Sequence, residues 1–240
     1  MASVLRRDFA ANIAKPDVAA KHQSLPDELY RTIGMVMSSG VIKTMPDDPT
    51  IKIISPDGKK VPLVWVFNSP DREMTGLSRY WNSDRPLLGL YSGSRQIPNT
   101  DDTRDRISAY YCDRILALFP DGNFYLAGNC RGGKIAHKML GFLNDRGVFP
   151  KRVMFLEYID QSLFDYPGEV RFVFGKQSHL RFAFSDLITA VLRTEKATDS
   201  RKLFWVEGRH GQFFYGQNGA GLAREIRAFL GEKEIAGLEH

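Results

Sequence analysis

A cysteine between two glycines stands where an apolar stretch gives way to an amphipathic one, in FYLAGNCRGGKIAHKM over residues 124–139. Gly128-x-Cys130-x-Gly132 has the spacing of a nucleophile elbow, G-x-S-x-G, with cysteine in place of serine. At such a sharp strand-to-helix turn, side chains two residues before and after the nucleophile would collide, which favours glycine there. The helix N-terminus favours a thiolate, and the N–H of Arg131 would face an oxyanion. The pattern predicts a nucleophile at Cys130, with a buried structural cysteine as the alternative.

A cysteine nucleophile needs a base that takes its proton and a group that orients the base. With the nucleophile on an elbow, the chain order is nucleophile, acid, histidine. His210 fits this order, because it lies in FWVEGRHGQFF directly after the last predicted strand. His179 also follows a strand and is the competing candidate. His137 lies on the elbow helix, and His22 and His240 lie near the chain ends.

The acid is expected at the end of a central strand, since crevices form at the carboxyl ends of parallel strands. Glu157 ends the apolar run RVMFLE, the first strand after the elbow helix. Asp160 and Asp165 are fallback candidates that read as exposed loop residues. We therefore expect Cys130, His210 and Glu157 to act together.

The elements that position these residues can be predicted from the pattern of the chain. Apolar runs alternate with helical patterns along most of it. Two β segments flank the turn signal at residues 56–59, and amphipathic helices are expected at 103–119, 132–147 and 220–230. This alternation predicts one α/β domain with a mostly parallel sheet and helices on both faces. Strands are predicted at 61–67, 87–90, 123–127, 152–156, 170–174 and 202–206.

Composition and the two ends of the chain indicate the domain boundaries, the partners and the location to expect. Residues 1–45 read as an N-terminal arm or linker with a short helix starting near Pro26, 46–237 as the domain, and 238–240 as a tag remnant. The net charge of +5 comes from dispersed basic residues, so neither nucleic acid nor a membrane is expected as a partner. With only Cys112 and Cys130, and no secretory leader, a reducing, cytoplasmic location is expected. Cys112 falls on a helical face and is expected to be buried and inert.

The stretch from residue 51 to 230 resembles the thioesterase domains of nonribosomal peptide and polyketide synthases. Its most specific part is ISAYYCDRILALFPDGNFYLAGNCRGGKIAHKMLGFLNDRG, which resembles the family's helix, strand and elbow. The resemblance implies the α/β-hydrolase fold, with Glu157 where the family usually has aspartate and Gly208-Arg209-His210 as its histidine loop. It also implies that the second oxyanion donor is the N–H of Asn68 or Ser69.

Three departures from the family pattern bear on function. Cysteine replaces serine, the oxyanion segment reads Phe67-Asn68-Ser69-Pro70, and few residues separate Glu157 from the next strand. The helical lid that the family inserts there is therefore expected to be reduced or absent. Either the pocket is open, or the arm or residues 179–195 cover it, although residues 179–195 fit better as an ordinary helix packed on the sheet.

The resemblance implies an enzyme that takes an acyl or peptidyl group from a carrier-protein thioester onto Cys130. Release by hydrolysis, cyclisation or transfer to an amine or hydroxyl would follow, with no metal and no cofactor beyond the phosphopantetheine that carries the substrate. Two alternatives stay open: a catalytically inactive carrier- or acyl-binding protein, and a free-standing hydrolase of small esters or thioesters. A nucleic-acid-binding role ranks below both.

Overall fold

The computed structural model describes residues 27–34, 41–81, 84–93, 97–195 and 200–232. Within them, one eight-stranded sheet has the order β1-β2-β4-β3-β5-β6-β7-β8. From β4 onward all neighbours are parallel, whereas β2 pairs antiparallel with both β1 and β4. The strands are β1 (Lys43–Met45), β2 (Asp48–Ile54), β3 (Leu63–Phe67), β4 (Leu87–Tyr91), β5 (Tyr125–Asn129), β6 (Arg152–Leu156), β7 (Glu169–Gly175) and β8 (Arg201–Val206). The helices are α2 (Asp27–Gly34), α3 (Pro70–Ser78), α4 (Asp101–Leu118), α5 (Arg131–Asn144), the 3₁₀ helix η2 (Gln161–Asp165), α6 (Leu180–Ala183), α7 (Ser185–Glu195) and α8 (Gly216–Phe229).

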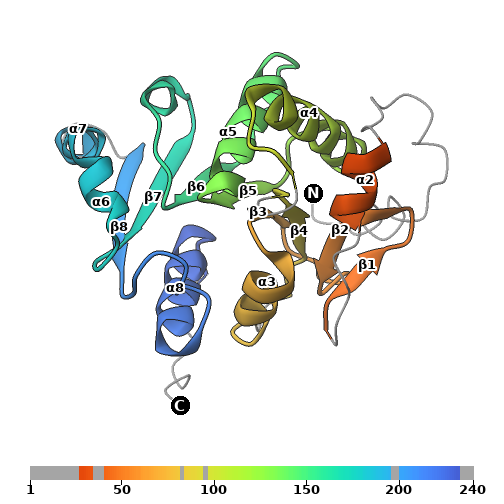
Figure 1. The fold of residues 1–240 in the computed structure, drawn as a ribbon, viewed down its shortest axis with the longest axis horizontal. Helices are drawn as coiled ribbons and strands as arrows, with labels where there is room; N and C mark the ends of the chain where they lie inside the picture. The colour runs from red at the N-terminus through yellow and green to blue at the C-terminus, as the bar shows by residue number, and fades with distance from the viewer. Residues whose placement is uncertain (1–26, 35–40, 82–83, 94–96, 196–199, 233–240) are drawn as a thin grey trace, which may run out of the picture.

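Helices cover both faces of this sheet, as the alternation of patterns predicted. Successive residues of a strand point to opposite faces. On β3, Val64 and Val66 belong to the core shared with α4 and α5, whereas Trp65 and Phe67 pack with residues of α3 and α8. Figure 1 shows these two helix pairs on opposite sides of the sheet. Both faces of the central strands are therefore buried, which explains their continuous apolar runs.

All six predicted strands are present as β3 to β8, with ends shifted by no more than two residues. The segments on either side of the predicted turn are β2 and β3, but β2 pairs with β4 rather than with β3. β2 begins at Asp48 instead of residue 51, because the buried Asp48 carboxylate accepts hydrogen bonds from Thr50, Tyr110 and Arg114. A charged residue can thus start a buried strand when three donors surround it.

The predicted arm includes two elements that contact the sheet. β1 pairs with β2, and the ring of Tyr30 on α2 lies edge-on against Tyr110 of α4. The expected helix start near Pro26, the rest of the arm to residue 26, and the proposed tag at 238–240 lie outside the described residues. The domain boundaries stay predictions.

Residues 158–168, between Glu157 and β7, contain only η2, and no helical lid stands there. On the neighbouring stretch, Ile188 and Val191 of α7 are buried in the core on the α4–α5 side, so residues 185–195 pack on the sheet as an ordinary helix. Phe182 of α6 does not share this face, since 69% of its surface is exposed. In the part of the chain that the structure describes, no helix has the length and apolarity needed to cross a membrane.

Candidate active site

The turn between β5 and α5 has the strained geometry of an elbow. Cys130 adopts φ 49° and ψ −115°, a conformation that L-residues rarely hold. A Cβ on Gly132 would lie 2.0 Å from the carbonyl oxygen of Val66 on β3, and one on Gly128 would lie 2.6 Å from the carbonyl oxygen of Gly132. Only glycines let the helix approach the sheet this closely.

Cys130, Glu157 and His210 lie together at the carboxyl ends of β5, β6 and β8. The Glu157 side chain is fully buried and accepts hydrogen bonds from Gly175 N at 2.7 Å and Ser178 Oγ at 2.5 Å. Its Oε2 also lies 3.1 Å from His210 Nδ1. The Cys130 Sγ is 3.7 Å from His210 Nε2 and 3.8 Å from Nδ1. The structure thus brings the three expected residues into contact.

The tautomer of His210 follows from its neighbour Glu157. An ionised carboxylate only accepts hydrogen bonds, so the contact with Glu157 places the imidazole proton on Nδ1 and leaves Nε2 as an acceptor. Since Sγ is almost equidistant from the two nitrogens, the ring must turn to aim Nε2 at the thiol. The side chain is 36% exposed, which leaves space for this rotation.

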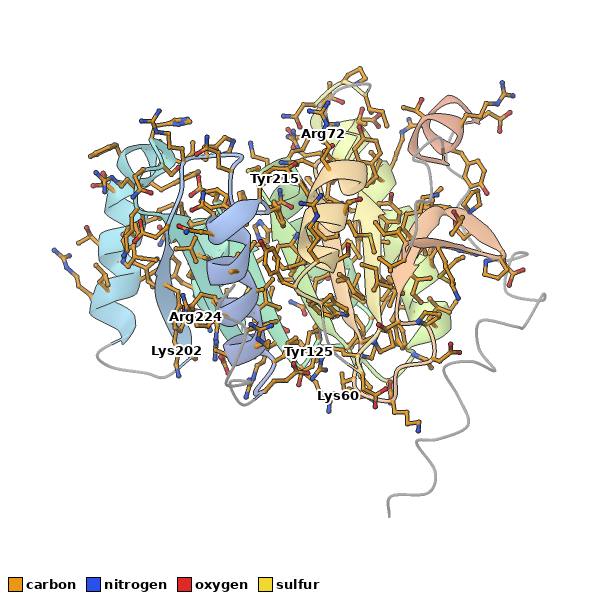
Figure 2. All side chains as sticks on the ribbon, turned by 90° about the horizontal axis from the view of Figure 1, so that it is seen from below. Lys60, Arg72, Tyr125, Lys202, Tyr215 and Arg224 are labelled. Carbon is orange, nitrogen blue, oxygen red and sulfur yellow. The ribbon has the colours of Figure 1, made fainter. Side chains whose placement is uncertain are left out.

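The loops after the strands gather on the same side of the sheet as this contact. Figure 2 shows Arg72 and Tyr215, which follow β3 and β8, at the end opposite Tyr125, the first residue of β5, and Lys202, the second residue of β8. Loops at this end of a parallel sheet border the crevice in which ligands bind.

The competing histidines have other neighbours. The ring of His179 lies edge-on against that of His210, with centroids 5.4 Å apart. On α5, His137 has its Nδ1 2.8 Å from the Tyr158 hydroxyl and its Nε2 2.9 Å from Ser162 Oγ. His22 and His240 lie outside the described residues. Of the histidines that the structure describes, only His210 lies within hydrogen-bonding distance of a cysteine sulfur.

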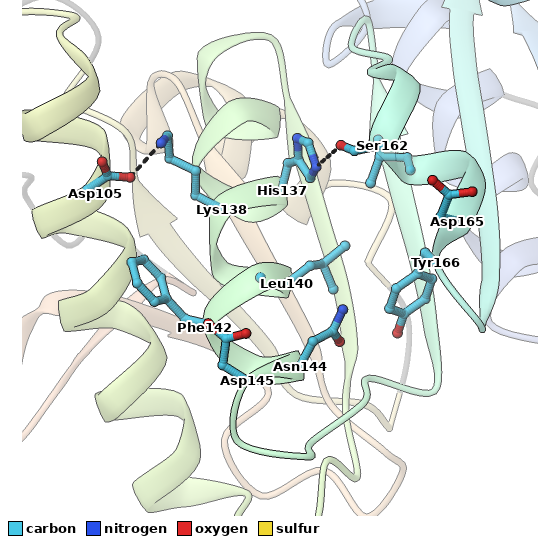
Figure 3. Close-up of a pocket in the computed structure, with 12 residues that line it drawn as sticks. Asp105, His137, Lys138, Leu140, Phe142, Asn144, Asp145, Ser162, Asp165 and Tyr166 are labelled. Atoms are coloured by element: carbon cyan, nitrogen blue, oxygen red, sulfur yellow. Dashed lines mark hydrogen bonds and ion pairs between the residues drawn. The ribbon is translucent and has the colours of Figure 1, made fainter.

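His137 and Ser162 line a pocket of about 500 Å³ between α5, α4 and the loop that carries η2 (Figure 3). The pair resembles a serine and its base, but Ser162 Oγ donates its single hydrogen to Asp160 Oδ1 at 2.7 Å. Asp160 therefore holds the η2 loop rather than orienting His210, and Asp165 lines the same pocket. Burial lowers the pKa of His137, so it stays neutral here. We infer that His137, Ser162 and Asp160 serve to join the η2 loop to α5.

Some of the N–H groups expected in the oxyanion hole already donate hydrogen bonds within the protein. Arg131 is the first residue of α5, and its N–H has no acceptor within the helix. In contrast, Asn68 N and Ser69 N both donate to Glu73 Oε2, at 2.9 and 3.2 Å. Asn129 Nδ2 donates to the same oxygen at 3.2 Å. The Glu73 carboxylate thus already accepts from the two backbone donors that the resemblance implies for the oxyanion hole.

Sequence reasoning missed Glu73. A detectable signal exists in Ser69-Pro70 followed by Glu73 in the first helical turn, a spacing close to a capping box. Burial raises the pKa of Glu73, while hydrogen bonds from Ser69, Asn129 and Asn68 oppose the rise. What the sequence does not reveal is that this first turn lies beside the elbow.

The Cys130 thiol differs from the thiolate that the helix N-terminus led us to expect. Burial raises its pKa to about 12, helped by the negative charges of Glu73 and Glu157. Hydrogen bonds from the side chains of Asn68 and Asn129 lower it by less. Cys130 is therefore protonated near neutral pH, and it needs His210 to take its proton during attack.

Glu73→Gln is expected to lower the pKa of Cys130, because it removes a negative charge while an amide oxygen can still accept from Asn68 N and Ser69 N. The alkylation rate with iodoacetamide follows the thiolate fraction, so it should rise about threefold to tenfold at a fixed pH below the pKa. The measurement is a pH profile in a Cys112→Ala background. Glu207→Gln, which removes an exposed carboxylate paired with Lys176, is the control. An unchanged profile for Glu73→Gln would contradict this electrostatic account.

Cys112 is buried as expected. Its Sγ lies 3.7 Å from the carbonyl oxygen of Met139, and burial raises its pKa to about 12. Across the residues that the structure describes, no group of three or more His, Cys, Asp or Glu side chains could hold a metal ion.

Comparisons with known proteins identify the architecture. No protein-family model matches the chain. Malpinin synthetase from Mortierella alpina is 35% identical over 97 residues, which are 39% of this chain but 1% of that protein. The chain therefore spans only a small part of the length of this relative.

Two solved structures share the fold of this chain. EstE7, a homologue of HSL from a metagenome library, superposes with a TM-score of 0.56 at 15% identity over 86% of this chain and 93% of that one. The thioesterase domain of NocB, in covalent complex with a nocardicin G analogue, gives a TM-score of 0.53 at 16% identity over 75% of this chain and 99% of that domain. These likenesses, together with the sheet order and the covered faces, show that the chain has the α/β-hydrolase fold.

Proposed function

We propose that the chain is a thioesterase-like enzyme that receives an acyl or peptidyl group on Cys130 from the thioester of a carrier protein. The observation that supports this most is the contact of Cys130 with His210 and of His210 with Glu157 at a strained elbow. Similarity to a segment of malpinin synthetase and to the fold of the NocB thioesterase domain agrees with it. Esterases share the fold as well, so the reaction class rests on the site.

In the first half-reaction, His210 Nε2 takes the thiol proton as Sγ forms a bond to the thioester carbonyl carbon. The carbonyl electrons move to oxygen, and neighbouring N–H groups hold the resulting oxyanion. When the carbonyl reforms, the bond to the carrier's sulfur breaks, and the imidazolium gives its proton to the leaving thiolate. The products are an acyl-cysteine and a free phosphopantetheine thiol.

In the second half-reaction, His210 takes a proton from water, an amine or a hydroxyl that attacks the acyl-cysteine. The Cys130 thiolate leaves and recovers the proton. Exchange of one thioester for another is nearly isoenergetic, so the acyl-cysteine keeps the transfer potential that an oxoester would lose. This favours transfer to an amine or closure of a ring, with hydrolysis as the simplest outcome.

A non-catalytic protein that binds a carrier or an acyl group is the second candidate. One observation favours it: the half-buried Cys130 thiol has a pKa raised to about 12 and lies beside a carboxylate that occupies two backbone donors. The buried, triply bonded Glu157 and its contact with His210 favour the enzyme, because a binding site has no use for this pair.

Intact-protein mass spectrometry after mixing with S-acyl N-acetylcysteamine thioesters and acylated carrier proteins tests the proposal. An acyl mass shift is expected on the wild type and on Cys112→Ala, but not on Cys130→Ala. Cys112 serves as the matched control, because it is a fully buried thiol. Absence of any adduct or turnover across the panel would favour the binding protein.

The same assay separates carrier-dependent from free-standing activity. If the carrier is part of the substrate, the carrier-bound acyl group should react faster than the same group on N-acetylcysteamine at equal concentration. The net charge of +5 suits an acidic carrier, so this advantage should shrink as the salt concentration rises. Equal rates for the two donors would identify a free-standing hydrolase of small thioesters.

A further inference from the structure

The two backbone N–H groups of the loop after β3 are already engaged. Asn68 N and Ser69 N both donate to Glu73 Oε2, and this carboxylate is further held by Asn129 Nδ2. An oxyanion that formed at these donors would have to displace a buried negative charge that itself repels it. The loop therefore needs another group to complete the oxyanion hole.

The side chain of Asn68 is held in one orientation by its neighbours. Gly132 N lies 3.0 Å from Asn68 Oδ1, and Ser92 Oγ lies 3.3 Å from the same atom. A backbone N–H can only donate, so the atom that faces Gly132 must be the amide oxygen. The amide nitrogen is therefore directed away from Gly132. A hydrogen bond from the Asn68 side chain is one of those that lower the pKa of Cys130.

The neighbouring side-chain amide of Asn129 makes different contacts. Its Oδ1 accepts from the indole Nε1 of Trp65 at 3.0 Å, and its Nδ2 donates to Glu73. Both ends of this side chain are thus used to join β5 to β3 and α3. Asn68 differs, because its amide oxygen accepts from both Gly132 N and Ser92 Oγ, and a hydrogen bond from its side chain lowers the pKa of Cys130.

We propose that the side-chain amide of Asn68, rather than the N–H of Asn68 or Ser69, is the second oxyanion donor, acting beside the N–H of Arg131. This inference rests on the proposed function and names a further catalytic residue for it. As Sγ bonds to the carbonyl carbon, the oxygen that gains charge lies next to the nucleophile, beside the Asn68 amide, whose oxygen is held at Gly132 N only two residues after Cys130. A neutral amide anchored at its oxygen end needs no reorganisation when that charge appears. Glu73 then acts as a positioning residue for the loop.

Two substitutions separate the amide donor from its anchoring role. Asn68→Asp keeps an oxygen for Gly132 N and replaces the donor by an acceptor. Asn68→Ala removes the donor without adding charge. Asn99→Ala is the control, because Asn99 is exposed and bonds Arg104 at the start of α4. The readout is the single-turnover rate of Cys130 acylation by an S-acyl N-acetylcysteamine thioester in a Cys112→Ala background.

Loss of one oxyanion donor should slow acylation by about 10²-fold to 10³-fold in both variants, with no slowing for Asn99→Ala. Alkylation by iodoacetamide builds no oxyanion. For Asn68→Ala, the fold-decrease in the alkylation rate should therefore be at least about ten times smaller than the fold-decrease in the acylation rate. Thermal unfolding of Asn68→Asp should stay close to that of the wild type, since its anchoring oxygen is kept.

Acylation of Asn68→Ala at the wild-type rate, or an equal fall in acylation and alkylation, would overturn the oxyanion role. The wild-type adduct on Cys130 would then still support the proposed function. If the wild type itself formed no adduct, the proposed function would fail, and the role of Asn68 would fail with it.

Discussion

Replacing Glu157 by glutamine is expected to slow acylation of Cys130 by about 10³-fold while the fold is retained. Gly175 N requires an oxygen acceptor, so the glutamine oxygen takes the place of Oε1. The amide NH₂ then faces His210 Nδ1, which can only accept from it. The imidazole proton is thereby moved to Nε2, the nitrogen that must take the thiol proton.

This result would be specific to the tautomer of His210. Ser178 Oγ can accept from the new amide, so only the hydrogen of the Ser178 hydroxyl loses its acceptor, and the free energy of unfolding should change by less than about 3 kcal/mol. The rate is measured by single-turnover mass spectrometry and stability by urea titration. Asp160→Asn is the matched control, because it alters the other candidate acid, three residues along the chain. An acylation rate within tenfold of the wild type for Glu157→Gln, or an equal loss for Asp160→Asn, would refute the assignment.

The sequence allows much of the fold to be predicted, because the central strands are buried on both faces. Continuous apolar runs such as LVWVF and RVMFL have no alternative interpretation once helical patterns separate them. The errors fall where local pattern and tertiary contact disagree. β5 was predicted to begin at Asn123 but begins at Tyr125, because its parallel register with Leu63 sets the first paired residue. β2 begins at Asp48, whose burial depends on donors from the distant α4.

The site was predictable to the extent that it follows chain order. Cys130, Glu157 and His210 each come directly or closely after a strand, and parallel strands place such residues at one edge of the sheet. Their contacts in the structure agree with that reasoning, while their catalytic roles stay predictions. Glu73 and the amide of Asn68 could not be found this way. Their importance depends on side-chain orientation across the β3–α3 turn, which spacing alone does not encode.

The elbow itself leads to the second large prediction: Gly132→Ala should destabilise the protein by about 3 kcal/mol or more. Gly132 is fully enclosed between α5 and β3, and a Cβ there would lie 2.0 Å from the carbonyl oxygen and 2.8 Å from the carbonyl carbon of Val66. The obstacle is the backbone of a central strand, which cannot turn aside as a flexible side chain can. β3 pairs with both β4 and β5, so a shift to relieve the clash would disturb two ladders.

Gly141 of the same helix provides the matched control. A Cβ there meets nothing within 4 Å, so Gly141→Ala should stabilise the protein by up to about 1 kcal/mol through helix propensity alone. Urea unfolding of both variants, with soluble yield recorded for Gly132→Ala, measures the contrast. If the two substitutions had similar effects, the close approach of α5 to β3 would not be needed for the fold. A large loss for Gly132→Ala beside a gain for Gly141→Ala would mean that Gly132 is required before any chemistry begins. The strained Cys130 can be held at the end of β5 only while α5 lies against the sheet.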